Sequence, residues 1–227
     1  MKRILTTLSE KWPEYLLEII VLVIGIYGAF ALDGWKDNLN DRREFESQIC
    51  QMIDELDQDI FFFSESRDIN QRYLIYLEHL ADRNYDSINV EEVLFHISKN
   101  LNTRNFGQAY QSLKAAGQLN LLKEETMKAS KDYYELACTD YNEWAVWHLK
   151  HVTENVESYM MSAIKFDRKS LAVASDVIAL LEDITFSNFV NFQIENYTRF
   201  VQIENSNIKL ANQLLERLTV YEPNCQP

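Results

Sequence analysis

Residues Tyr15 to Leu32, YLLEIIVLVIGIYGAFAL, decide the architecture of this chain. Eighteen residues at the α-helical rise span about 27 Å, close to the roughly 30 Å hydrocarbon core of a bilayer. Glu18 is the only charged residue in the stretch and lies in its first turn. Trp12 and Trp35 flank the two ends, where membrane–water interfaces favour aromatic residues. The stretch predicts one transmembrane helix over 15–32, preceded by a short segment over 1–14.

Two other interpretations of the apolar stretch are open. A cleaved signal peptide would explain the basic start of the chain and the sequence Ala29-Phe30-Ala31. However, Glu10 and Glu14 precede the apolar run, and a helical pattern resumes directly after Leu32, which favours a retained helix. The other interpretation is the core helix of a soluble protein, which rarely has so long an uninterrupted apolar run.

Small residues share one face of the predicted transmembrane helix. Gly25 and Ala29 are four residues apart, and Gly28 adjoins them. This spacing lets two membrane helices approach closely and predicts a homo-oligomer, although Gly and Ala are also common in membrane helices that do not associate. Glu18 is either a functional intramembrane carboxylate or a group at the interface near a helix N-terminus, and we favour the second interpretation.

The composition limits what the rest of the chain can be. The 227 residues are 47% hydrophobic and 25% charged, which is typical of a folded protein. Five Gly and three Pro are too few for the tight turns of an all-β fold. The net charge of −13 would repel nucleic-acid phosphates, so we expect no nucleic-acid partner.

Helical periodicity continues beyond the apolar stretch. Apolar residues recur three or four positions apart at Phe45, Ile49, Met52, Leu56, Ile60 and Phe63. This helix is expected to reach about Leu80, with a bend near 64–68. Further helices are predicted over 90–101, 108–116, 123–165, 171–183 and 187–218, with Gly117 ending the second and Ser170 and Ser187 capping the last two. The last helix has its own stripe: Val190, Ile194, Tyr197, Val201, Ile208, Leu215 and Leu218.

The predicted fold class is therefore all-α. One N-terminal transmembrane helix precedes an antiparallel helical bundle with long helices over 33–222, and a short tail occupies 223–227. No linker rich in Gly or Ser and no internal repeat divides the bundle.

Catalytic and cofactor-binding signatures are absent from the sequence. It contains no GxGxxG, Walker, GxSxG or HExxH motif. His148 and His151 lie one helical turn apart but lack further ligands at a spacing diagnostic of a metal, so a solvated pair is expected. The carboxylates of residues 54–59 fall on the polar side of a helix and are expected to face solvent. We therefore predict no enzyme, no cofactor and no metal.

An aromatic cluster is the one candidate ligand pocket in the soluble part. Its possible lining residues are Tyr133, Tyr141, Trp144 and Trp147, with Tyr134 beside them. Helical spacing makes these residues more typical of a packed core than of a pocket.

The three cysteines give no recognisable framework. Cys50 and Cys138 lie in helical patterns and are expected to act as small hydrophobic residues, while Cys225 lies in the tail. Wide spacing and an odd count in a chain of this size argue against both a metal site and a disulfide framework.

Two stretches carry a resemblance to a known family. One is Glu18-Ile19-Ile20-Val21-Leu22-Val23-Ile24-Gly25-Ile26, continuing through Ala29-Phe30 to Trp35. The other runs from Tyr110 to Leu122, YQSLKAAGQLNLL, and is followed by Tyr133-Tyr134. Together they resemble a bacterial family of uncharacterised single-span membrane proteins with a helical soluble domain. The resemblance implies an all-α inner-membrane protein and transfers no activity and no site residues.

Three functions fit these predictions. The first is a membrane-anchored interaction or scaffold protein that self-associates through the transmembrane helix and the stripe over 45–63. The second is a ligand-sensing bundle that signals through a membrane protein partner. The third is an oligomeric membrane effector or pore component in bacterial defence. Three basic residues lie near the span on each side, and the amino terminus adds a positive charge to the N-terminal side, which slightly favours a bundle outside the cytoplasm.

Overall fold

The computed structural model describes residues 2–87, 89, 92, 95, 97–99, 101–163, 178–220 and 225. Every regular element in these ranges is helical, which confirms the all-α prediction. The chain divides into two compact units, an N-terminal unit over 1–47 and a helical domain over 48–227. We describe each unit by itself.

Helix α1 runs from Lys2 to Ala81 and contributes to both units. In the N-terminal unit it contains the one helical stretch, among the described residues, that is apolar and long enough to cross a membrane. Every side chain from Leu16 to Leu32 is exposed within the chain. The bend predicted near 64–68 is absent, because the segment from Trp35 to Ala81 contains no glycine or proline and its helical hydrogen bonding continues.

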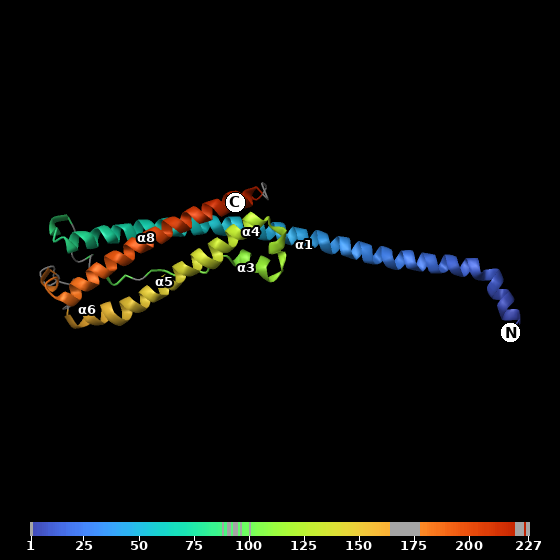
Figure 1. The fold of residues 1–227 in the computed structure, drawn as a ribbon, viewed down its shortest axis with the longest axis horizontal. Coiled ribbons are helices and arrows are strands. Elements are labelled where there is room, and N and C mark those ends of the chain that lie inside the picture. Colours follow the sequence, from blue (N-terminus) through green and yellow to red (C-terminus); the bar gives the residue numbers. More distant parts are fainter. Residues whose placement is uncertain are drawn as a thin grey trace. The chain divides into compact units, whose positions relative to one another are not determined.

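The helical domain contains the rest of α1 and a series of further helices (Figure 1). In the described part of the chain they are η1 (Tyr85–Ser87), α3 (Gln108–Ala115), η2 (Gln118–Leu121), α4 (Glu124–Lys131), η3 (Asp132–Ala137), α5 (Cys138–His151), η4 (Val152–Glu157), α6 (Ser158–Ala163) and α8 (Ile184–Thr219). Segments η3 and η4 are π-helical turns, so α4 to α6 form one uninterrupted helical run. Gly117 has a φ of 70° and ends α3, as the sequence predicts.

The start of α8 corrects one predicted helix cap. Asp183, rather than Ser187, is the N-cap, and its carboxylate accepts hydrogen bonds from the backbone N–H groups of Thr185 and Phe186. These bonds lower the pKa of Asp183. Residues 171–177 of the predicted helix over 171–183, and half of the residues of the one over 90–101, lie outside the described residues; residues 178–180 are helical, as predicted.

The core of the domain lies between α1, α8 and the run from α4 to α6 (Figure 1). The stripe on α1 is confirmed at Ile49, Met52, Leu56 and Phe63, which are fully buried. One apolar cluster joins α1, Ile97, the η4–α6 part of the helical run and α8, and it consists of Leu77, Leu80, Ile97, Val152, Val156, Met160, Phe186, Val190 and Tyr197. Because the α1 stripe packs inside its own domain, its buried residues are not a free surface for self-association.

The buried face of α8 differs from the predicted stripe. Val190, Tyr197 and Leu218 are buried as expected, whereas four polar residues also occupy the core: Gln193, Asn196, Glu204 and Asn207. Apolar periodicity misses such positions, because polar side chains enter a core only where partners on other helices satisfy their hydrogen bonds.

A disulfide joins Cys50 to Cys225, with the two Cα atoms 5.1 Å apart. This corrects the prediction that Cys50 acts as a small hydrophobic residue and that no disulfide forms. The two residues are 175 positions apart in the sequence, so spacing alone gives no signal of the pairing. Cys138 is free and buried, as predicted.

Candidate functional site

The predicted self-association face lies in the N-terminal unit. Glu18, Gly25, Gly28 and Ala29 are all exposed there, and a Cβ atom added at Gly25 or Gly28 would meet nothing within 4 Å. A groove of about 540 Å³ lies along this face. Its lining residues are Leu17, Glu18, Val21, Leu22, Gly25 and Ile26. The glycine at position 25 thus leaves the helix backbone open to close approach.

The four residues predicted as a possible pocket lie in two different environments. Tyr133 and Tyr141 are fully buried in the core, and the Tyr141 ring packs edge-on against Phe63 with centroids 5.1 Å apart. Trp144 and Trp147 lie nearer the surface, and Trp147 is 42% exposed.

The π-helical segment η3 sends two successive tyrosines inward. In a regular α-helix neighbouring side chains point about 100° apart, so only one of them would face a flat core. Here the N–H of Cys138 bonds to the carbonyl of Tyr133, which widens the turn. Tyr133 and Tyr134 are both buried as a result. Insertions of this kind are frequent at functional sites.

Helix α1 contributes a buried carboxylate next to these tyrosines. Asp59 is only 1% exposed, accepts a hydrogen bond from the Tyr133 hydroxyl at 3.1 Å, and pairs with Arg104 at 3.3 Å. Burial raises the pKa of Asp59 to about 6, even though Arg104 and Tyr133 act in the opposite direction. The prediction that this carboxylate faces solvent is wrong, because a loop distant in the sequence covers it.

That loop, residues 101–107, is held on two sides. On α5, the Asn142 side chain accepts the Arg104 N–H at 3.2 Å and donates to the Arg104 carbonyl at 2.8 Å. On α1, the half-buried carboxylate of Glu55 accepts the N–H of Ala109 at the start of α3. Gly107, the N-cap of α3, has no capping side chain, so Glu55 satisfies a helix end that is 54 residues away.

Removing Arg104 should destabilise the domain in a pH-dependent way. We expect Arg104→Met to cost about 2 kcal/mol at pH 8, because it leaves Asp59 buried without its cation. This figure lies below that for a fully buried pair, since the Arg104 side chain is 30% exposed. The cost should shrink near pH 5, where Asp59 already carries a proton. Urea unfolding at the two pH values measures both effects.

Arg217→Met is the matched control for this prediction. Arg217 pairs with Glu125 at 3.1 Å, but both side chains are exposed. Exposed pairs contribute little, so a change within about 0.5 kcal/mol is expected at either pH. Equal losses in the two variants would show that the buried pair has no special role.

Both the backbone conformation at position 107 and a neighbouring side chain require a glycine there. Its φ is 68°, and a Cβ atom there would lie 2.5 Å from the Cδ1 atom of Tyr134. The Tyr134 ring therefore rests directly on the backbone of the loop. Its hydroxyl is buried and has no hydrogen-bond partner in the described part of the chain, an arrangement that costs about 1–3 kcal/mol.

Gly107→Ala should therefore be more damaging than the same change at Gly117. Gly117 has almost the same φ of 70°, but a Cβ atom there would have nothing within 4 Å. We expect about 1 kcal/mol for Gly117→Ala from the backbone alone, and about 2 kcal/mol for Gly107→Ala, because the tyrosine ring must also move. Thermal unfolding of the two variants gives the comparison, and equal losses would contradict the role of Tyr134.

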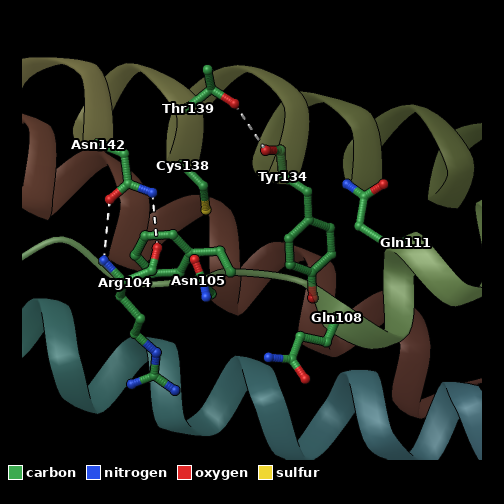
Figure 2. A pocket seen from close by; sticks show the side chains of 9 residues that line it. Arg104, Asn105, Gln108, Gln111, Tyr134, Cys138, Thr139 and Asn142 are labelled. Carbon is green, nitrogen blue, oxygen red and sulfur yellow. Dashed lines mark hydrogen bonds between the residues drawn. The ribbon is translucent and has the colours of Figure 1, made fainter.

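A pocket of about 500 Å³ opens between this loop, α3 and α5 (Figure 2). Its lining residues are Arg104, Asn105, Phe106, Gln108, Gln111, Tyr134, Cys138, Thr139 and Asn142. None of the four predicted pocket residues lines it. The features of the sequence that could have indicated this pocket are Gly107, which adjoins its lining, and the Tyr133-Tyr134 pair, of which Tyr134 lines it.

Sequence reasoning also missed two buried polar groups between the helices. Glu204 on α8 accepts hydrogen bonds from Ser66 and Asn70 of α1, at 2.6 Å and 2.8 Å. Burial raises the pKa of Glu204 to about 7. His148 is fully buried and its Nε2 lies 2.9 Å from Gln193 Oε1, which corrects the prediction of a solvated histidine pair. Burial lowers the pKa of His148.

Comparison of the chain with models of known families, with curated proteins and with solved structures gives no match. The family resemblance found in the sequence thus stays a prediction.

Proposed function

We propose that this chain is a single-pass protein of a bacterial inner membrane, whose helical domain acts outside the cytoplasm as an interaction or scaffold module without catalysis. The observation that carries the proposal is the exposed apolar stretch from Leu16 to Leu32. Apolar surface in water costs about 25 cal/mol per Å², and a bilayer removes that cost over a length that this stretch matches. The domain over 48–227 has its own buried core and needs no contribution from this stretch.

In this proposal the domain is the antiparallel bundle that the sequence predicts. Three pairings between α1 and the C-terminal part of the chain support it. The disulfide joins position 50 to 225, Ser66 bonds to Glu204, and Leu80 shares an apolar cluster with Phe186. Later positions on α1 are thus paired with earlier positions in the C-terminal part of the chain, as in antiparallel helices.

The Cys50–Cys225 disulfide supports a location outside the cytoplasm. Disulfides persist in oxidising compartments such as the bacterial periplasm and are rare in the reducing cytosol. The acidic domain then lies away from the anionic cytoplasmic leaflet.

Maleimide labelling of intact cells tests the location. Cells are treated with a membrane-impermeant reductant and then with a membrane-impermeant maleimide. We expect labelling only after reduction, when Cys50 and Cys225 become free thiols. A Cys50→Ser, Cys225→Ser variant is the control and should stay unlabelled, because Cys138 is buried. Labelling that appears only after lysis would place the domain in the cytoplasm and overturn this part of the proposal.

Self-association through the helix face that carries Glu18, Gly25 and Ala29 completes the proposal. Glu18 and Gly25 are seven residues apart and therefore share a face. The groove beside Gly25 supports the close backbone approach that small residues permit. The bilayer and a second copy of the chain are then the partners of the N-terminal unit, and the domain is left to contact other proteins.

Sedimentation of the full chain in detergent tests self-association. Gly25→Leu should shift the wild-type oligomer toward monomer, because the added side chain separates the backbones. Ala31→Leu places the same side chain about 120° round the helix from position 25 and should leave the oligomer intact. A wild-type chain that sediments as a monomer at every concentration would refute self-association.

A further inference from the structure

The pocket beside loop 101–107 is built almost wholly from uncharged hydrogen-bonding groups. In a chain with 35 Asp and Glu residues, none of its nine lining residues is acidic. Four are amides, namely Asn105, Gln108, Gln111 and Asn142, and Thr139 adds a hydroxyl. This lining offers paired donors and acceptors without a net charge.

The one charged residue of the lining is already neutralised. Figure 2 shows the Arg104 side chain directed toward α1, away from the amide groups. Its guanidinium pairs with Asp59 and donates to the carbonyl and side chain of Gln58. What Arg104 presents beside the pocket is its backbone, and both backbone groups are bonded to Asn142. An ionic ligand would thus find no unpaired charge there.

Three amides remain for a ligand. Asn105, Gln108 and Gln111 make no side-chain hydrogen bond within the described ranges of the chain, and Figure 2 shows them around the Tyr134 ring. Tyr134 is 5% exposed and its hydroxyl is fully buried, so this side chain offers the pocket its ring rather than its hydroxyl. Phe106 adds an apolar aromatic surface to the same lining.

We propose that this pocket binds an uncharged saccharide. Each amide supplies a donor and an acceptor together, which matches the hydroxyl groups of a sugar because every hydroxyl also donates and accepts. The apolar side of a pyranose ring suits an aromatic lining such as that of Phe106. A volume of about 500 Å³ admits a ligand of one or two sugar units. The site goes beyond the proposed scaffold function and does not depend on self-association.

Saturation-transfer NMR on the full chain tests the proposal. The probes are glucose, galactose, mannose and N-acetylglucosamine, with glucose 6-phosphate as a charged comparison. The detergent must have a phosphocholine headgroup, because maltoside and glucoside detergents would compete for the site. We expect transfer to at least one neutral sugar and weaker transfer to glucose 6-phosphate than to glucose.

Two exposed glutamines give a matched pair of variants. Gln111→Leu removes an amide of the pocket and should weaken binding at least tenfold, whereas Gln213→Leu on α8 should leave it unchanged. Far-UV circular dichroism checks that both variants fold. The proposal is overturned if no probe shows transfer, if Gln111→Leu binds as tightly as wild type, or if the phosphorylated sugar binds more tightly than glucose.

Discussion

Loss of the Cys50–Cys225 disulfide should lower the free energy of unfolding of the helical domain by about 2–5 kcal/mol. The bridge closes a loop between residues 175 positions apart. A cross-link restricts the unfolded chain more strongly as the loop lengthens, so we expect a value in the upper part of this range. Position 225 would then no longer be linked to α1.

Guanidinium unfolding with and without reductant measures this effect. The Cys50→Ser, Cys225→Ser variant should unfold at the same denaturant concentration in both conditions, and wild type in reductant should match it. Cys138 is free and buried in all samples, so it does not contribute to the difference between them. A wild-type midpoint that does not respond to reductant, under conditions where the thiols are shown to be free, would contradict the prediction.

Glu204→Gln should stabilise the domain at alkaline pH by roughly 3 kcal/mol and leave it almost unchanged at pH 4.5. Glu204 has no exposed surface, and its Oε2 atom has no hydrogen-bond partner in the described residues. Ionisation therefore places a charge in the core without full compensation. Glutamine resembles the protonated acid in shape and charge, and its carbonyl can still accept from Ser66 and Asn70.

The direction of the pH effect follows from the raised pKa. Burial lifts the pKa of Glu204 from 4.5 to about 7, so between these values the folded chain holds a proton that the unfolded chain lacks. Stability contributed by this group is fully present below pH 4.5, falls as the pH rises, and is lost above pH 7. Arg67 and Asp68 on α1 act on this carboxylate with opposite signs.

The difference between variant and wild type isolates this one group. Burial also raises the pKa values of Asp59 and Glu55, and lowers that of His148, but all three remain in both proteins. Urea unfolding at pH 4.5, 6 and 8.5 should give a difference that grows with pH. Glu195→Gln, at an exposed position on α8, should give no such trend. A pH-independent Glu204→Gln effect would show that the carboxylate is not buried as a proton-binding group.

Local features of the sequence were sufficient for the helical architecture. The apolar run at 15–32, the stripe from Ile49 to Phe63 and the stop at Gly117 each depend on residues within a few turns of one another. Helix propensity, periodicity and glycine conformation act over that range, so each could be predicted without a partner. The N-cap at Asp183 is an equally local feature, but Ser187, four residues later, is also a residue type that favours the N-cap position.

The sequence by itself therefore determined that the chain is helical, which stretch suits a membrane, and which apolar face of α1 is buried. Only the tertiary structure decided which polar residues and cysteines are buried and which partners they have. Asp59 meets Arg104 and Tyr133, Glu204 meets Ser66 and Asn70, and Cys50 meets Cys225, across separations of 45 to 175 residues. A carboxylate or thiol has the same helical spacing whether it faces water or a distant partner, and its burial becomes favourable only once the fold brings that partner within bonding distance.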